Sequence, residues 1–280
     1  KKLMYRNNIL LTFSDYNSTS EIGIYKKKKC RELDPVENIK LIDLKTKLIA
    51  RNFLNWLKLN NIDTIYNYKN NEGIFNHIAI RNNGNNFMIE LYLFKENLEI
   101  LNKLKEFNFN KLNISSVYYQ IQNSNKNNFR KSFNLLTGNE YLSYNILDKV
   151  INIKAGCFFQ TNNEVLKQMY SDITDYCIKD NNYNFLDLYC GVGVVSILMN
   201  RYYNICIGIE INKNSIEIAD YNKLVNNCNN CKFICSPVED IIDNINHNNL
   251  VIFVNPPRRG LYKNVIDKLN QIKNKIKQII

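Results

Sequence analysis

The stretch that decides the fold reads FLDLYCGVGVVSILM and covers residues 185–199. A compact apolar run comes first, a turn containing Gly191 and Gly193 follows, and a second apolar run extends to Met199. This pattern predicts a strand, a tight turn and a helix, which is the repeating unit of a parallel sheet. Glycines in such a turn let the backbone approach a ligand closely.

The residues around this stretch continue the alternation of strands and helices. Strands that alternate with helices form a parallel sheet with right-handed crossovers. The sequence therefore predicts an α/β fold with a Rossmann-like sheet over residues 156–280. The further strands expected in this domain are 205–209, 231–235 and 250–254, and the helices are 164–178 and 215–226.

The first half has a different character, and we expect a smaller α+β domain over residues 1–155. Two apolar runs flank a turn at 82–85 that contains a glycine, which predicts a hairpin. The strands expected in this domain are 9–13, 21–25, 74–81, 87–94 and 115–122, and the helices are 41–59 and 96–107.

The composition is that of a globular protein, with 280 residues of which 45% are hydrophobic. No run of about 18 apolar residues occurs, which excludes a membrane-spanning helix. The first residues, KKLMYRNNILL, lack the pattern of a signal peptide, so we expect a cytoplasmic location. The eight cysteines are then expected to be reduced thiols.

The charge balance favours a polyanionic partner. Lys and Arg number 37 against 26 Asp and Glu, a net charge of +11, which suits RNA. A genome rich in A and T would also produce an excess of Lys, Asn, Ile and Tyr, so the charge alone does not decide. The run Lys26–Lys29 is expected either to contact RNA phosphates or to be a solvated loop.

Ligands of an open parallel sheet bind beyond the carboxyl ends of its strands. Four features stand at such ends: the glycine turn, Glu210, which is placed to accept both hydroxyls of a ribose, Glu239, where an adenine would lie, and Asn255. A dinucleotide site needs a third glycine, whereas Ser196 occupies that position. A nucleoside-binding site is therefore favoured, and a purely structural turn is the alternative.

On these motifs the chain resembles the RNA uracil-5-methyltransferase family. The resemblance covers nearly the whole chain, and the combination of FFQTN with PPRRGL is its most specific part. The segments that carry it, in order, are LMYRNN, IGIYKKKK, FNHIAIR, LLTGNEYL, GCFFQTNNEVLKQMY, FLDLYCGVGVVSILM, GIEINKNSIEIADYNK and VIFVNPPRRGL.

The resemblance implies S-adenosylmethionine as the cofactor. Gln160, Tyr189 and Glu210 match residues that bind it, and Gly191 and Gly193 would line its amino-acid and ribose portions. Asn255 stands where the family usually has an Asp that faces cofactor and substrate; Asn keeps the acceptor oxygen but loses the charge.

The resemblance also implies a covalent mechanism. A cysteine thiolate adds to carbon 6 of uracil, carbon 5 takes the methyl group, and a carboxylate base then removes the carbon 5 proton. In the family the nucleophile follows the strand after the D-P-P-R position, so it would fall just beyond Ile280. We therefore expect a chain truncated at both ends, with no catalytic residue of its own and no turnover alone.

Several narrower expectations follow. The segment 33–38 contains no Cys, so no iron–sulfur cluster is expected, and His77 is expected to be structural, with Asn76 where the family commonly has Arg. Cys228 and Cys231 have the spacing of half a zinc site, but a complete ligand set is lacking, so no metal site is expected. The resemblance favours ribosomal over transfer RNA, and we expect a monomer.

Two other functions remain open. One is an RNA- and cofactor-binding remnant that has lost the chemistry. The other is an amino-group (adenine N6) methyltransferase, in which N-P-P is followed by an aromatic residue that stacks on a flipped base. Arg258 occupies that aromatic position here, which argues against the second.

Overall fold

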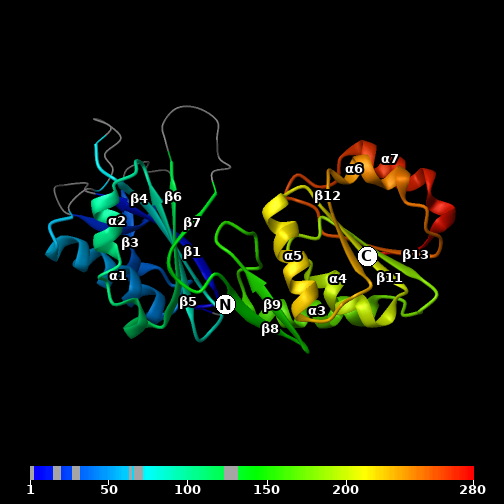
Figure 1. Cartoon of the computed structure of the whole chain (residues 1–280), viewed down its shortest axis with the longest axis horizontal. Helices are drawn as coiled ribbons and strands as arrows, with labels where there is room; N and C mark the ends of the chain where they lie inside the picture. The colour runs from blue at the N-terminus through cyan, green and yellow to red at the C-terminus, as the bar shows by residue number, and fades with distance from the viewer. Residues whose placement is uncertain (1–2, 15–19, 27–31, 63–64, 66–71, 123–131) are drawn as a thin grey trace. The chain divides into compact units, whose positions relative to one another are not determined.

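The computed structural model describes residues 3–14, 20–26, 32–62, 65, 72–122 and 132–280 (Figure 1). The chain forms two compact units. The first contains Lys1–Leu142 and Gln160–Glu164, and the second contains Ser143–Phe159 and Val165–Ile280. This division differs from the domain boundary predicted between residues 155 and 156, because residues 143–159 are grouped with the second unit. The division into an RNA-contacting domain over residues 1–155 and a cofactor-binding domain over residues 156–280 stays a prediction.

The first unit is built on a seven-stranded sheet with the order β3-β2-β1-β4-β5-β6-β7. Its neighbouring strands are antiparallel except for β5 and β6, which are parallel and are joined through α2 (Leu98–Leu104). The strands are β1 (Asn8–Ser14), β2 (Glu21–Tyr25), β3 (Leu33–Pro35), β4 (Phe75–Asn82), β5 (Phe87–Leu93), β6 (Ile114–Ile121) and β7 (Asn134–Gly138).

Helix α1 (Leu44–Leu59) closes the core of this unit. It begins at Asp43, whose carboxylate accepts a hydrogen bond from the Thr46 N–H across 2.8 Å. Its apolar face is buried, and Phe53 packs against the rings of Phe13 and Phe75 at centroid distances of 6.2 and 6.1 Å. The sheet, the predicted hairpin and both helices confirm the expected α+β fold.

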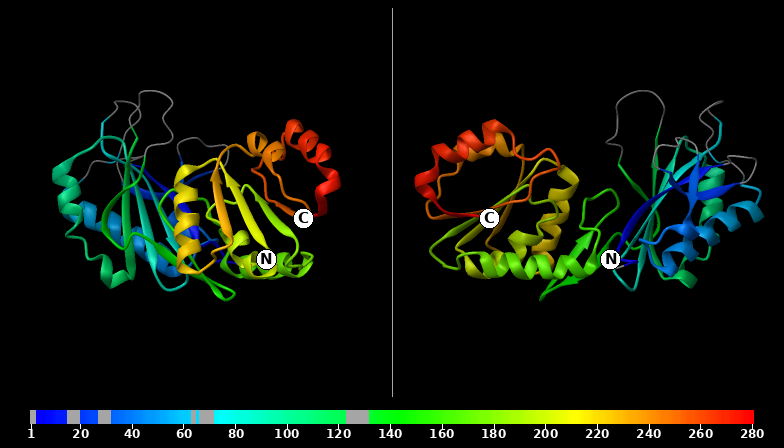
Figure 2. Two further views of the ribbon diagram at one scale, coloured as in Figure 1. Left: turned by 45° about the vertical axis from the view of Figure 1, so that its right-hand side comes forward. Right: turned by 180° about the vertical axis from the view of Figure 1, so that it is seen from behind.

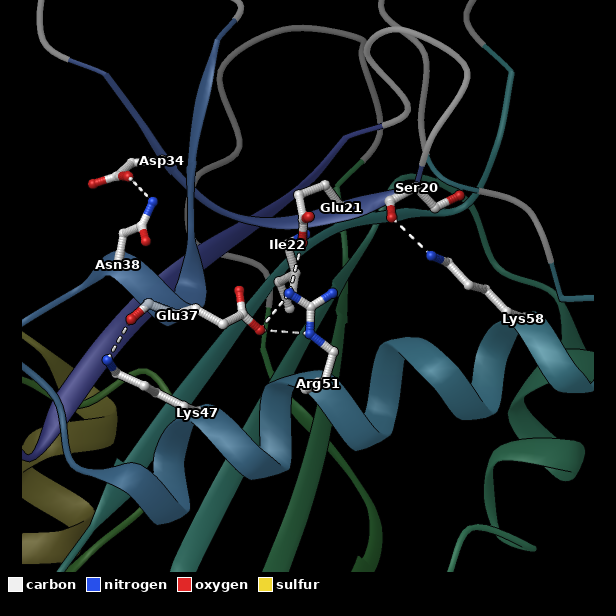
Figure 3. Close-up of polar contacts among 9 residues, drawn as sticks. All are labelled: Ser20, Glu21, Ile22, Asp34, Glu37, Asn38, Lys47, Arg51 and Lys58. Atoms are coloured by element: carbon white, nitrogen blue, oxygen red, sulfur yellow. Dashed lines mark hydrogen bonds and ion pairs between the residues drawn. The ribbon is translucent and has the colours of Figure 1, made fainter.

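A polar cluster fastens the outer segments of the unit to α1 (Figure 3). Arg51 donates from Nε to Glu37 across 2.6 Å and contacts Glu21 at 3.1 Å. Lys47 and Lys58 on the same helix donate to the carbonyl oxygens of Glu37 and Ser20 across 2.7 and 2.9 Å. These partners lie in or beside β2 and the short 3-10 helix Val36–Asn38. The polar contacts of α1 therefore attach these two segments to the helix.

The basic run Lys26–Lys29, expected either to contact RNA or to be a solvated loop, falls mostly outside the described residues. Lys26 is described and forms an ion pair with Glu32. Lys27–Lys29 lie outside the described residues. Contact between this run and RNA therefore stays a prediction.

The second unit contains a five-stranded parallel sheet with the order β12-β11-β10-β13-β14. Helices α4 and α5 pack on one face, and α6 and α7 pack on the other (Figures 1 and 2). The elements are β10 (Asn184–Leu188), α4 (Val194–Met199), β11 (Ile205–Glu210), α5 (Lys213–Val225), β12 (Cys231–Cys235), α6 (Val238–Ile241), β13 (Leu250–Val254), α7 (Lys263–Gln271) and β14 (Ile276–Ile279).

Helix α3 (Asn163–Tyr176) and the hairpin β8 (Leu142–Ile146) and β9 (Lys149–Ile153) precede this sheet. The parallel order confirms the predicted Rossmann-like fold. Strand β14 lies where the sequence anticipated the start of a strand, paired with β13. In the described part of the chain, no helix is both long and apolar enough to cross a membrane.

Candidate functional site

The turn between β10 and α4 has an unusual backbone. Tyr189, Gly191 and Gly193 have φ angles of 65°, 55° and 81°, and Tyr189 has a side chain that makes this conformation uncommon. The N–H of Cys190 donates to the Ile209 carbonyl across 3.0 Å, so the turn is fixed to the end of β11. Non-glycine residues keep such conformations only where the surroundings impose them.

The two glycines of the turn serve different purposes. A Cβ on Gly193 would lie 2.6 Å from the ring of Phe233, so a side chain has no room there. A Cβ on Gly191 would meet nothing within 4 Å, so this glycine faces open space and is required for its φ angle. The turn therefore packs tightly at Gly193 and leaves an open approach at Gly191.

Asp187 lies in β10, just before the turn, and connects this strand to α4. It is 1% exposed and accepts hydrogen bonds from the N–H and the hydroxyl of Ser196 across 3.1 and 2.8 Å. Burial raises the pKa of the Asp187 carboxyl to about 7, although the bonds from Ser196 act in the opposite direction. Ser196, which breaks the three-glycine pattern in the sequence, thus ties α4 to β10.

Glu210 ends β11 beside the turn. One of its carboxylate oxygens accepts from the Gly191 N–H across 3.2 Å, and the other accepts from the Asn212 N–H across 2.9 Å. A carboxylate oxygen can accept a further hydrogen bond when one is in place. Glu210 is therefore held in one orientation by the backbone and keeps acceptor capacity for the hydroxyls of a ligand.

Tyr189 carries a hydroxyl that is buried and has no hydrogen-bond partner among the described residues. Burial raises the pKa of this hydroxyl, and the nearby Glu239 and Tyr262 add to the shift. Buried polar atoms in proteins almost always have a partner, and exceptions mark places where a ligand or water supplies it. The residues of this edge thus fit a polar ligand that reaches Tyr189.

Asn255 lies at the same edge of the sheet. Strands β10 and β13 are parallel, and Leu188 lies opposite Val254, so the next residues, Tyr189 and Asn255, leave adjacent strands at the same level. Asn255 is exposed. Five of the six predicted cofactor-binding residues therefore gather at the carboxyl ends of three adjacent strands.

The sixth predicted residue, Gln160, belongs to the first unit. Its carbonyl oxygen accepts from the side chain of Asn7 across 3.0 Å, and the Thr161 carbonyl accepts from the Asn7 N–H across 2.8 Å. The backbone of this segment is therefore fastened next to β1. The role of the Gln160 side chain stays a prediction.

A comparison with protein families decides the assignment. The family model described as tRNA (Uracil-5-)-methyltransferase matches residues 134–279, more than half of the chain. The chain belongs to this tRNA (uracil-5-)-methyltransferase family. The match confirms the resemblance seen in the sequence, and it includes the glycine turn, Glu210 and Asn255.

Individual relatives agree with this membership. A protein from Clostridium tetani named as an uncharacterized RNA methyltransferase is 26% identical over an alignment 276 residues long, which covers 95% of this chain and 60% of the relative. A similarly named protein from Fusobacterium nucleatum is 28% identical over an alignment 280 residues long, which covers 96% of this chain and 59% of the relative. The chain thus spans about 60% of the length of these relatives.

A solved structure shares the fold. It is the Pyrococcus abyssi tRNA (uracil-54, C5)-methyltransferase in complex with S-adenosyl-L-homocysteine, with a TM-score of 0.80 and 19% identity. The similarity covers 99% of this chain and 66% of that chain.

Within this uracil-5-methyltransferase family member, the structure also reveals polar residues that sequence reasoning missed. Asn222 of α5 is completely buried and bonds to Asn152 and to the Val192 carbonyl. The available signal was its position on the helix face that also carries Ile218 and Ala219, which are buried.

The cysteines form no metal centre in the described part of the chain, where no group of three or more His, Cys, Asp and Glu side chains could hold an ion. Cys228 and Cys231 are free, buried thiols. Burial raises the pKa of the Cys190 thiol, and the charges of Asp187 and Glu210 add to that shift.

Proposed function

We propose that the protein is an S-adenosylmethionine-dependent RNA methyltransferase that transfers a methyl group to carbon 5 of a uridine. Family membership supports the reaction class. The observation that carries the cofactor assignment is the buried Tyr189 hydroxyl, which has no hydrogen-bond partner in the described part of the chain and lies at the same edge as the oriented carboxylate of Glu210. The proposed binding residues are Gln160, Tyr189, Gly191, Gly193, Glu210 and Asn255.

Each residue of the edge has a distinct task in this proposal. Glu210 accepts hydrogen bonds from the ribose hydroxyls, and because backbone N–H groups already orient it, little side-chain entropy is lost on binding. Gly191 presents open backbone to the ligand. The Tyr189 hydroxyl gains the partner that it lacks.

The bound cofactor would supply an electrophilic methyl group on a sulfonium centre. The chain's own residues hold and orient it, and Asn255 lies at the edge where cofactor and substrate would meet. The resemblance assigns neither the nucleophile nor the base to residues 1–280. We therefore propose cofactor binding for these residues and the complete reaction for the longer proteins of the family.

Calorimetry tests the cofactor assignment. S-adenosylhomocysteine and S-adenosylmethionine titrated into the 280-residue chain are expected to bind at one site and to raise the thermal unfolding temperature. Absence of both heat and thermal protection in a folded sample would overturn the proposal.

The RNA substrate is a separate test. We propose ribosomal RNA as the substrate. Transfer RNA is the second candidate, and the names of the family and of the Pyrococcus abyssi enzyme support this second candidate. Unmodified transcripts of both are incubated with a full-length protein and labelled cofactor, and the ribosomal RNA is expected to yield 5-methyluridine. Product on the transfer RNA alone would overturn the choice of ribosomal RNA. A 6-methyladenosine product would instead identify an amino-group methyltransferase, and binding without product would identify a remnant.

The proposal also includes a monomer, a cytoplasmic location and no iron–sulfur cluster. Light scattering, cell fractionation and the visible absorption spectrum of anaerobically purified protein test these three points. A dimer, a membrane fraction or a visible band from bound iron and sulfide would contradict the respective statement.

A further inference from the structure

Asn222 is a fully hydrogen-bonded side chain in the interior of the second unit. It is 0% exposed. Its Oδ1 atom accepts from the backbone N–H and the side-chain amide of Asn152 across 2.8 and 3.1 Å. Its Nδ2 atom donates to the carbonyl oxygens of Asn152 and Val192 across 3.0 and 3.1 Å. Both donor hydrogens and both acceptor sites of the amide are thus used.

These four bonds join three segments of the unit. Asn222 lies on α5, Asn152 on β9, and Val192 in the middle of the glycine turn. One side chain therefore connects the helix after β11, the hairpin before α3 and the turn that leaves β10. Removing a donor from such a network leaves a buried carbonyl without its partner, which costs more than an average hydrogen bond contributes.

We infer that Asn222 is a positioning residue for the proposed cofactor site. It acts through the peptide between Val192 and Gly193 and makes no contact with the cofactor itself. The turn is held at Cys190 by the Ile209 carbonyl, at Gly191 by Glu210, and at Val192 by Asn222. The first two fastenings come from β11, and the third comes from α5.

The hydrogen bond from Asn222 to the Val192 carbonyl is needed because the backbone of a turn that contains glycines can adopt many conformations. Gly191 and Gly193 flank Val192, and glycines rotate with little steric hindrance. When the Val192 carbonyl is released, the turn can reorient, and the 3.2 Å contact between the Gly191 N–H and Glu210 weakens with it. Glu210 then loses one of the two N–H groups that orient its carboxylate.

Asn226, one helical turn further along the chain, supplies a matched control. It also joins α5 to β9, because it accepts from the Val150 N–H across 2.9 Å and donates to the Val150 carbonyl across 2.7 Å. The Nδ2 atom of Asn226 also donates to the carbonyl of Asn222 within the helix across 2.8 Å. Replacing Asn226 therefore weakens the attachment of the hairpin and leaves the fastening of the turn in place.

The test compares Asn222→Asp, Asn222→Ala and Asn226→Ala in the 280-residue chain. The Asp variant keeps the size of the side chain and its acceptor oxygens but has no donor for Val192. We expect both Asn222 variants to bind S-adenosylhomocysteine about tenfold more weakly, whereas Asn226→Ala stays within about twofold. The backbone amide signal of Gly193 is expected to shift in the NMR spectra of the Asn222 variants and not in that of Asn226→Ala.

A measurement on the unsubstituted chain covers the case in which the Asn222 variants do not fold. The side-chain NH₂ signals of Asn222 are expected to move when S-adenosylhomocysteine is added, while those of Asn226 stay in place. Unchanged Asn222 signals on saturation, or equal affinity losses in Asn222→Ala and Asn226→Ala, would overturn the inference. This inference rests on the proposed function, and a wild-type chain that binds no cofactor would refute the proposed function itself.

Discussion

The carboxylate of Glu210 accepts a hydrogen bond from the backbone N–H of Gly191 across 3.2 Å. This contact joins the segments that leave two neighbouring parallel strands, β10 and β11. It places an oriented negative charge beside the open face of a glycine turn.

Glu210→Gln is expected to weaken binding of S-adenosylhomocysteine by about tenfold or more. The amide has one acceptor oxygen where the carboxylate has two, and hydrogen bonds to charged groups contribute about 1.5–3 kcal/mol each. Calorimetric titration measures the effect. Glu217→Gln is the control, because Glu217 is a solvent-exposed residue of α5 that pairs with Lys213 at 4.0 Å. Equal affinities of the two variants would contradict the prediction.

Tyr189→Phe is expected to change stability and binding in opposite directions. Without a ligand, removal of an unsatisfied buried hydroxyl leaves the free energy of unfolding unchanged or raises it by about 1 kcal/mol. With a ligand, the variant loses the partner offered to the cofactor and binds more weakly. Urea unfolding and calorimetry measure the two effects, and a variant that is destabilised but binds normally would show that the hydroxyl is structural.

Asp187→Asn tests the buried carboxyl beneath the turn. Its pKa is raised to about 7, above its value of about 3.9 in an unfolded chain, so the folded state binds the proton more tightly. The stabilisation from this group is present below about pH 4 and is lost as the pH rises through about 7. The wild-type chain should therefore lose stability relative to Asp187→Asn between pH 4 and pH 8 in urea unfolding. A difference that does not vary with pH would refute this assignment.

Ser196→Ala should accentuate the same behaviour. The bonds from Ser196 lower the pKa of Asp187, so loss of the hydroxyl is expected to raise that pKa further. Carbon-13 NMR of the Asp187 carboxyl across the pH range measures the shift. A midpoint equal to that of the wild-type chain would contradict the role given to Ser196.

Gly193→Ala should destabilise the fold more than Gly84→Ala. Both glycines have a positive φ, 81° and 102°, but only Gly193 would place a Cβ against a ring, 2.6 Å from Phe233. Backbone strain costs about 1–2 kcal/mol in each variant, and overpacking adds about 1–3 kcal/mol at Gly193. Chemical denaturation compares the two, and adding Phe233→Leu to Gly193→Ala should recover part of the loss. An equal loss of unfolding free energy in the two glycine variants would show that the Phe233 ring moves aside at no measurable cost.

The sequence predicted the second unit well where strands are continuous apolar runs. Strands β10, β11 and β13 were expected within a residue of their observed ends, because buried parallel strands show such runs. The edge strand β12 was also expected at its observed ends, although only Cys231 of its residues is buried. Helix α7 was missed although Val265, Ile266 and Leu269 have helical spacing, because its nine residues are fewer than the window of about 11 over which such a pattern is recognised. Strand β8 was missed because its residues alternate between buried and exposed, so it lacks the continuous apolar run of a strand that is buried on both faces.

The site was predicted only where its residues follow strand ends. Tyr189, Glu210 and Asn255 stand directly at such ends, so the topology alone brings them together. Asn222 does not follow a strand end and could not be found in this way, and the one signal for it was its position on the helix face of Ile218 and Ala219. Gln160 was assigned from the resemblance alone.

The groups that hold Glu210 belong to the main chain. Its carboxylate is oriented by the N–H of Gly191 and the N–H of Asn212, so at position 212 any residue other than proline supplies the same donor. Substitutions can therefore change most neighbouring side chains at this edge of the sheet while the Glu210 carboxylate keeps its orientation. An edge of this kind tolerates sequence divergence, and the positions most sensitive to substitution are the few whose side chains hold the main chain itself in place.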